Sequence, residues 1–273
     1  MIAALNLGLI DYGTALRLQE SLVELRKQGR IPDVLLLLEH PPVITLGRNA
    51  KETNVVASRE FLAAQGIEVF EINRGGDVTF HGPGQLVGYP IFDLRGFSPK
   101  LGAVDYVRKL EEVLIRTCAH YAIPAQRIKG MTGVWTAPGL RSRADGGASG
   151  RAEERKIAAI GVHISRGVTS HGFALNVSTD LEQFKLIVPC GLAKPVTSIA
   201  LERGAPLSVD EVREAVACQF GAVFNTEIFW LESLDHLLGA AEGEKKDRAW
   251  PQDTPAKVPE SLRRLRGEDT HLA

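Results

Sequence analysis

Cysteine is scarce in this chain, which has only Cys118, Cys190 and Cys218 among its 273 residues. A small, odd number of cysteines argues against a disulfide scaffold and is typical of a reducing compartment. No apolar run approaches the ~20 residues that a membrane-spanning helix needs. The N-terminal stretch MIAALNLGLIDYG has no basic segment, so we identify no secretion signal. We therefore expect a cytoplasmic protein that does not associate with membranes.

An excess of charge of one sign is also missing, because 32 Lys and Arg residues nearly balance 33 Asp and Glu residues. This balance argues against a nucleic-acid-binding protein. The chain has no GxxxxGK[ST] phosphate loop, and Gly82–Gly84 leads into a strand pattern, where a dinucleotide fingerprint would lead into a helix. His81, His163 and His171 have no HExxH or CxxC partner, so we expect no metal site.

The apolar pattern predicts an α+β fold with a mixed, mostly antiparallel sheet and helices packed on one side. The continuous apolar run 34–39 predicts a strand buried on both faces, and 43–47 is expected to be its hairpin partner. Helical spacing predicts helices over 12–28, 58–65 and 103–120, and a Ser208–Glu211 capping box opens another helix to about Phe224. Further strands are expected at 5–10, 68–73, 86–94, 133–136, 156–165 and 171–177, the last two as a hairpin.

Two segments depart from this pattern. Residues 137–155 are rich in Gly, Arg and Ala without periodicity, which predicts a mobile surface loop. Residues 239–273 are polar and charged with scattered prolines, which predicts a disordered or loosely docked tail. We therefore expect one domain over residues 1–238.

The stretch RGGDVTFHGPGQLVGYP, from Arg74 to Pro90, is the richest in glycine. Such a backbone bends sharply and lets another group approach closely. From the residues alone, a plain glycine-rich hairpin is an equally good interpretation, with Arg74 in solvent and His81 bonded to the backbone.

Cys190 follows an apolar run, between a proline and a glycine, and Lys156 begins an otherwise apolar strand. A nearby cation lowers the pKa of a thiol and produces the nucleophilic thiolate. Taken singly, each residue has a simpler interpretation: Cys190 as a small buried hydrophobe, and Lys156 as a lysine that reaches water from the strand end. Cys118 shares a helical stripe with apolar residues and is expected to be a core thiol.

Taken together, these stretches resemble the lipoyl(octanoyl) transferases, a family within the biotin/lipoate protein ligase superfamily. The family pattern RGGxxTxHxxGQ…Y is matched from Arg74 to Tyr89. Four further motifs occur in the family's order: LEHPPVITLGR (38–48), KIAAIGV (156–162), HGFALNV (171–177) and PCGL (189–192). The resemblance runs from about residue 5 to 225, and neither the 137–155 insertion nor the tail replaces a motif residue.

The resemblance implies the ligase superfamily fold, with residues 1–238 as the catalytic domain. It implies transfer of an octanoyl group from octanoyl-acyl carrier protein to a lysine of lipoyl domains, in lipoate biosynthesis. The acceptors would be the lipoyl domains of 2-oxoacid dehydrogenase complexes and the glycine cleavage H protein. Cys190 would carry the acyl group as a thioester, with Lys156 as its catalytic partner. Neither ATP nor a metal would be required, and the protein would be a monomer.

The resemblance also implies an acyl-binding pocket. One wall would consist of Arg74, Gly75, Gly76, Asp77, Val78, Thr79, Phe80 and His81, and the opposite wall of Ala159, Ile160, Gly161, Gly172, Phe173 and Ala174. Small residues on strands leave room for an acyl chain. Arg48 and Arg74 are candidates for receiving the acidic partner proteins.

Two other functions stay open at this point. An ATP-dependent lipoate or biotin protein ligase would share the fold, bind an adenylate and need no nucleophilic cysteine. A non-catalytic acyl- or lipoyl-domain-binding protein would leave Cys190 inert. A requirement for ATP and magnesium would identify the ligase, and the absence of a covalent adduct on Cys190 would identify the binding protein.

Overall fold

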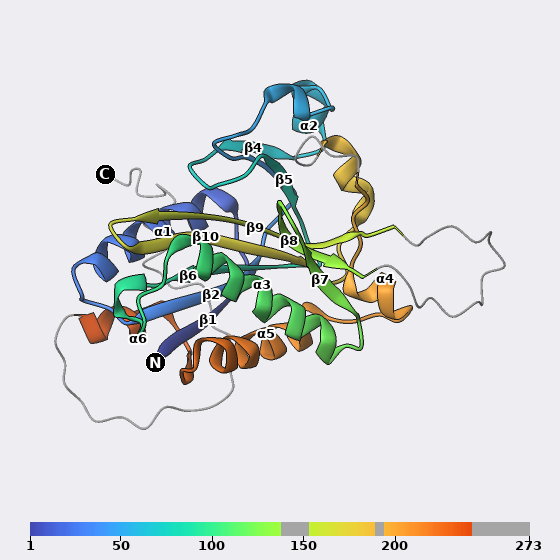
Figure 1. The fold of residues 1–273 in the computed structure, drawn as a ribbon. Coiled ribbons are helices and arrows are strands. Elements are labelled where there is room, and N and C mark those ends of the chain that lie inside the picture. Colours follow the sequence, from blue (N-terminus) through green and yellow to red (C-terminus); the bar gives the residue numbers. More distant parts are fainter. Residues whose placement is uncertain (138–152, 189–193, 242–273) are drawn as a thin grey trace, which may run out of the picture.

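The structure, a computed structural model, describes residues 1–137, 153–188 and 194–241. Within these residues, one sheet has eight strands in the order β11-β1-β2-β6-β10-β9-β8-β7, and a second has three in the order β4-β3-β5 (Figure 1). The strands are β1 Ile2–Leu9, β2 Asp33–Glu39, β3 Val43–Leu46, β4 Glu68–Glu71, β5 Val78–His81, β6 Gln85–Ile91, β7 Ala125–Ile128, β8 Met131–Thr136, β9 Lys156–Ser165, β10 Val168–Asn176 and β11 Ile228–Leu231. The α-helices are α1 Tyr12–Lys27, α2 Arg59–Ala64, α3 Ala103–His120, α4 Ile199–Arg203, α5 Val209–Phe224 and α6 Leu234–Ala241, and short 3-10 helices are η1 Glu52–Asn54, η2 Leu94–Gly96 and η3 Leu181–Leu186.

The large sheet is mostly antiparallel. Strand β1 runs parallel to its neighbours β2 and β11, and the pairs from β2 through β6, β10, β9 and β8 to β7 are antiparallel. The predicted hairpin of 156–165 with 171–177 is present as β9 and β10. The α+β class and the mixed sheet flanked by helices are therefore confirmed.

Helices cover both faces of the large sheet, so the prediction of helices on one side is wrong. Strand β2 explains why, because its side chains alternate between two cores. Leu35 and Leu37 pack with α3 and α5 on one face, whereas Leu36 and Leu38 pack with α1 and α6 on the other. A strand that is apolar on both faces needs an apolar layer on each side.

The expected hairpin between residues 34–39 and 43–47 is also wrong. Strand β3 leaves the large sheet and pairs with β4 and β5. Its Ile44 and Leu46 bury against Leu62 of α2 and Phe80 of β5, in a separate apolar cluster. Because β5 belongs to the small sheet and β6 to the large one, the glycine-rich segment crosses from one sheet to the other instead of forming a hairpin.

The predicted helix starts agree with the structure. Ser58 accepts a hydrogen bond from the Phe61 N–H at the start of α2, and Ser208 forms the predicted capping box with Glu211 at the start of α5. Cys118 is fully buried in the core, as expected. Among the described helices, none combines the length and the apolar character that crossing a membrane requires. Of the predicted tail, residues 242–273 lie outside the described residues. Of the predicted insertion, residues 138–152 lie outside them as well.

Candidate active site

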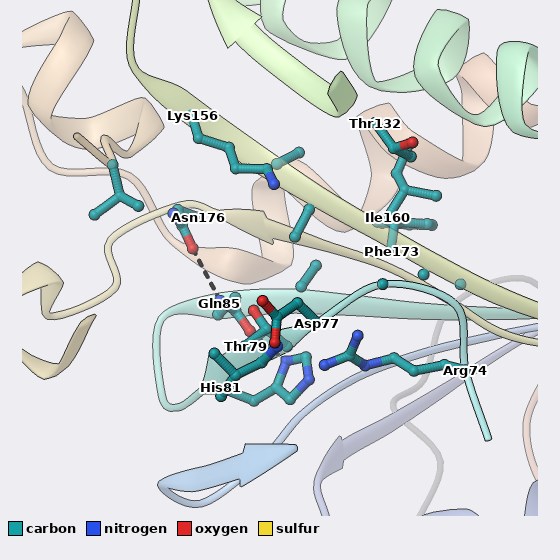
Figure 2. A pocket seen from close by; sticks show the side chains of 18 of the residues that line it. Arg74, Asp77, Thr79, His81, Gln85, Thr132, Lys156, Ile160, Phe173 and Asn176 are labelled. Atoms are coloured by element: carbon teal, nitrogen blue, oxygen red, sulfur yellow. Dashed lines mark hydrogen bonds between the residues drawn. The ribbon is translucent and has the colours of Figure 1, made fainter. Parts of the chain in front are cut away.

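A cavity of about 320 Å³ lies between the small sheet and the large sheet (Figure 2). Strand β5 and the loop before it form one wall, and β9 and β10 form the opposite wall. Residues of β6, of β8 and the turn before it, Tyr12 of α1, Phe184 of η3, and Lys194 and Val196 complete the lining. This volume is near the lower end of the ~300–1,000 Å³ that small-molecule sites usually have.

Nearly all of the predicted pocket residues line this cavity. They are Arg74, Gly76, Asp77, Val78, Thr79, His81, Ala159, Ile160, Gly161, Gly172, Phe173 and Ala174. The two exceptions are Gly75 and Phe80. The Phe80 side chain points into the core of the small sheet, where its ring contacts Phe184 with a centroid distance of 5.6 Å. Gly75 ties its loop to β9, because its N–H donates to the Val162 carbonyl at 2.9 Å.

Glycine at position 161 lets the two walls approach. A Cβ atom there would lie 2.7 Å from the Gly75 carbonyl oxygen, a distance that real Cβ atoms do not adopt. On the other wall, Gly76 has a φ of 91°, which favours glycine. The glycine-rich segment therefore packs its own backbone against β9, and the neighbouring small residues form the cavity.

Lys156 lies at the rim of the cavity, at the first position of β9. Its backbone N–H donates to the Pro195 carbonyl oxygen at 2.9 Å, and its backbone carbonyl accepts from the Thr197 N–H at 2.9 Å. Its ammonium nitrogen lies 5.1 Å from the ring centroid of Trp135, within the range of a cation–π interaction. Lys156 is half-buried.

Cys190 lies outside the described residues, so its distance from Lys156 is not part of this structure. The described chain stops at Val188, whose N–H donates to the Asn54 carbonyl at 2.7 Å. It resumes at Lys194, which lines the cavity together with Val196. The chain on the C-terminal side of Cys190 therefore borders the cavity, and that on the N-terminal side is held by Asn54.

A chain of hydrogen bonds runs under the cavity from His81 to the segment that pairs with Lys156. Asn176 Nδ2 donates to the Thr197 carbonyl at 2.9 Å, which leaves Asn176 Oδ1 as an acceptor. Gln85 Nε2 donates to this Oδ1 at 2.9 Å, drawn as a dashed line in Figure 2, and to the Phe80 carbonyl at 3.2 Å. Gln85 Oε1 must then accept from His81 Nδ1, at 2.8 Å. Two backbone carbonyls thus fix His81 as the Nδ1–H tautomer.

The floor of the cavity is a cluster of four rings, of which Tyr12, His81 and Tyr89 line the cavity and His40 is buried against them. The ring centroids of Tyr12 and His81 lie 6.1 Å apart and nearly parallel, and those of His40 and His81 lie 5.9 Å apart. His40 Nδ1 donates to the Ile10 carbonyl, so its Nε2 accepts from the Tyr89 hydroxyl, both at 2.7 Å.

Burial keeps these floor groups uncharged at neutral pH. Loss of hydration lowers the pKa of His40 to about 4 and that of His81 to about 3. The same loss of hydration raises the pKa of Tyr12 and of Tyr89. The floor is therefore polar but neutral, which suits an apolar or uncharged ligand.

Arg74 is buried, with 8% of its surface exposed. Its Nη2 donates to the Thr45 carbonyl at 2.8 Å and to the Thr45 hydroxyl at 3.0 Å. This guanidinium joins the glycine-rich loop to β3, so it does not offer a surface charge to a partner protein. Arg48 is exposed and stays a candidate for that role.

His171, near Arg74, has an unusual backbone. Its φ of 54° lies in the left-handed region, and its N–H donates to Gln19 of α1 at 2.8 Å. Its Nε2 lies 2.7 Å from the Asn73 side-chain oxygen. Burial lowers the pKa of His171 to about 3, so this side chain is neutral as well.

Several cavity residues were not among the predicted site residues. They are Tyr12, Gln85, Tyr89, Gly130, Met131, Thr132, Trp135, Ala158, His171, Asn176, Phe184, Lys194 and Val196. Gln85, Tyr89 and Asn176 lie inside the sequence motifs quoted above, so the signal for them was present. Tyr12 and Trp135 lie in ordinary helix and strand patterns that give no such signal. Across the described ranges, no group of three or more His, Cys, Asp or Glu side chains is arranged to hold a metal ion.

Comparison with known proteins identifies the family. Residues 11–221 match the model of the lipoyl protein ligase A/B catalytic domain. The chain is 56% identical to an octanoyltransferase of Koribacter versatilis over 273 residues, which is the whole of both chains. It is 58% identical to an octanoyltransferase of Acidobacterium capsulatum over 242 residues, covering 86% of this chain and 94% of that one.

Solved structures show that the fold is shared with ligases. A bipartite lipoate protein ligase from Thermoplasma acidophilum superposes with a TM-score of 0.63 at 15% identity, over 89% of this chain and 91% of that one. A lipoate-protein ligase A bound with ATP gives a TM-score of 0.61 at 15% identity, over 88% and 92% of the two chains. Because these identities are low, the likeness concerns the fold alone. The chain therefore belongs to the lipoyl protein ligase A/B family, within its octanoyltransferase group, and is an acyltransferase of lipoate biosynthesis.

Proposed function

We propose that this enzyme moves an octanoyl group from octanoyl-acyl carrier protein to a lysine of a lipoyl domain, through a thioester on Cys190. Lys156 is the catalytic partner of Cys190 in this proposal. The acceptors are the lipoyl domains of 2-oxoacid dehydrogenase complexes and the glycine cleavage H protein, and the enzyme acts as a monomer.

One observation carries the proposal beyond the family assignment. The backbone of Lys156 is hydrogen-bonded on both sides to the segment Pro195–Thr197. Cys190 precedes Pro195 by only five residues, and an extended chain spans at most about 3.6 Å per residue. The Cα atoms of Cys190 and Pro195 therefore cannot be more than about 18 Å apart. The pairing also lies at the rim of a cavity of a size that suits a small acyl chain.

The first half-reaction is an exchange between thioesters. The Lys156 ammonium stabilises the Cys190 thiolate by its charge and so lowers the pKa of that thiol. The thiolate attacks the octanoyl carbonyl, a bond forms between Cys190 sulfur and this carbon, and the bond to the carrier-protein sulfur breaks. The carrier-protein thiolate leaves and takes up a proton.

The second half-reaction forms the amide. The amine of the acceptor lysine attacks the acyl carbon, and the bond from this carbon to Cys190 sulfur breaks. The attacking amine has to lose a proton: the Lys156 ammonium gives a proton to the departing Cys190 sulfur and takes up the one that the amine loses. Exchange of a thioester for an amide is downhill, so the proposal includes neither ATP nor a metal ion.

The neutral cavity floor supports an acyl ligand. Neutral rings beside a hydrocarbon chain leave no charge without hydration, and the buried Arg74 guanidinium, which also lines the cavity, is bound by Thr45. His40 bonds the Ile10 carbonyl and the Tyr89 hydroxyl, and His81 Nδ1 donates to Gln85, while all three side chains stay neutral. Val78, Ile160 and Phe173 add apolar surface to the lining.

The test is intact-protein mass spectrometry after incubation with octanoyl-acyl carrier protein in the absence of ATP. Wild type should gain the mass of one octanoyl group, and hydroxylamine should remove it, as expected for a thioester. Cys190→Ala should gain nothing. An adduct that forms only when ATP and magnesium are added would replace this proposal with the ligase mechanism.

A further inference from the structure

Gly133 of β8 lies directly under the side chain of Lys156. It is buried, and its φ is 118°, a conformation that only glycine adopts readily. A Cβ atom at this position would lie 2.9 Å from Lys156 Cε and 2.6 Å from the Ala158 carbonyl oxygen. A side chain at 133 would therefore press on the Ala158 carbonyl and displace the Lys156 side chain from its present position.

The strand around Gly133 is irregular. The pairing of β8 with β9 shifts register between Val134 and Trp135, so that Val134 faces Ala158 while Trp135 faces Lys156. This irregularity brings the Trp135 ring beside the Lys156 ammonium and the bare Cα of Gly133 beside its stem. The two residues together define where the side chain of Lys156 can lie.

A buried carboxylate holds this piece of backbone. Glu111 of α3 has only 1% of its side chain exposed. Its Oε2 accepts from Arg108 Nη1 at 2.7 Å and from Arg127 Nε at 3.1 Å. Its Oε1 accepts from the Gly133 N–H at 3.3 Å. The two arginines that bind Oε2 thus balance the charge of the carboxylate, and Oε1 anchors the Gly133 N–H.

We propose that Gly133 is a positioning residue for Lys156 and that Glu111 holds Gly133 in the conformation this role requires. The inference rests on the proposed role of Lys156 at Cys190, and it adds two residues that do not touch the substrate. Because Gly133 has no side chain, the methylene groups of Lys156 can pass over it toward the rim of the cavity. The hydrogen bond from the Gly133 N–H to Glu111 keeps β8 from moving into this space.

The test measures alkylation of Cys190 by iodoacetamide as a function of pH, in a Cys218→Ser background because Cys218 is exposed. Gly133→Ala is made with Lys156 present and with Lys156→Ala. With Lys156 present, we expect alkylation at pH 7 to slow by about fivefold or more, a usual coupling between contacting residues. In the Lys156→Ala background, Gly133→Ala should have a much smaller further effect, because the displaced side chain is absent and only the strain at Gly133 and its contact with the Ala158 carbonyl remain.

Gly29→Ala is the matched control, since Gly29 also has a positive φ, 70°, but an added Cβ there meets nothing within 4 Å. It should leave alkylation unchanged. If Gly133→Ala unfolds the protein, Glu111→Gln carries the same test, because an amide cannot accept on both sides as the carboxylate does. Equal slowing in both Lys156 backgrounds would overturn the inference. If Lys156→Ala alone leaves alkylation and acyl transfer at wild-type rates, the proposed role of Lys156 fails instead.

Discussion

The ammonium nitrogen of Lys156 lies 5.1 Å from the centroid of the Trp135 ring. The ammonium nitrogen of Lys194 lies 5.7 Å from the same centroid, and it also donates to Glu154 at 2.7 Å. A single indole thus contacts two cations at the rim of the cavity. The negative face of the ring favours the charged form of a lysine held over it.

Replacing Trp135 by leucine should therefore slow acylation of Cys190. Loss of a cation–π contact of about 0.5–2 kcal/mol corresponds to a decrease of about 2- to 30-fold. Trp135→Phe keeps an aromatic face and should keep more of the rate than Trp135→Leu. The rate is measured by mass spectrometry with octanoyl-acyl carrier protein. Equal rates for the leucine and phenylalanine variants would show that the ring acts only by filling space.

Removal of Lys156 should change the reactivity of Cys190 and not only the overall transfer rate. Without the ammonium, the thiol returns toward its ordinary pKa of ~8.5, so its alkylation profile should move to higher pH in Lys156→Ala. Cys118 does not interfere, because burial raises the pKa of its thiol to about 12. The profile is followed with iodoacetamide in the Cys218→Ser background. An unchanged profile would contradict the activating role of Lys156.

His81 should remain neutral, as the Nδ1–H tautomer, from pH 5 to pH 8. Its hydrogen-bond chain through Gln85 fixes the tautomer, and burial lowers its pKa to about 3. In ¹⁵N NMR, Nδ1 should be protonated and Nε2 unprotonated across this range. Gln85→Glu places a carboxylate against Nδ1 and should raise the His81 pKa until titration becomes visible. Titration of wild-type His81 near pH 6.5 would disprove this assignment.

Acid should destabilise the fold before its carboxylates are protonated. Burial holds the pKa of His40 at about 4 and those of His81 and His171 at about 3, below the 6.5 of an unfolded chain. Between about pH 6.5 and 4 the unfolded chain binds protons that the folded chain does not, so the free energy of unfolding falls as pH falls. Each histidine contributes up to about 1.4 kcal/mol per pH unit in this window.

Urea denaturation at several pH values between 7.5 and 5 measures this effect. Stability should be greatest above pH 6.5 and should decrease steadily toward pH 5. In His40→Gln, the free energy of unfolding should fall less steeply with pH, by the equivalent of about one fewer proton taken up on unfolding. A free energy of unfolding that stays level between pH 7 and pH 5 would mean that the three rings are already protonated in the folded state.

Regular, periodic segments could be predicted from sequence because their signal is local. The helices at 12–27 and 103–120 and the hairpin of β9 with β10 agree with the structure for this reason. The pairing of β3 could not be predicted in the same way. A four-residue run that is buried on every side fits either sheet, and its partners are chosen by apolar contacts with α2 and β5.

In the candidate site, too, residues in local motifs could be predicted, whereas contacts between distant positions could not. The cavity walls lie in motifs that the sequence displays, so their residues could be named in advance. The link from Gln85 to Asn176 joins positions 91 residues apart, and it depends on the register between β6 and β10. The Glu111–Gly133 contact likewise joins a helix to a strand 22 residues later, and nothing in the local pattern indicates it.

The neutral floor of the cavity also has a kinetic consequence. None of its histidines or tyrosines changes protonation between about pH 5 and pH 9, because their pKa values lie outside this window. An acyl chain bound as proposed would therefore meet the same floor throughout that range. In the proposed mechanism, a bend in a plot of log(kcat/KM) against pH would then be assigned to Cys190, Lys156 or the incoming amine, and not to the rings of the floor.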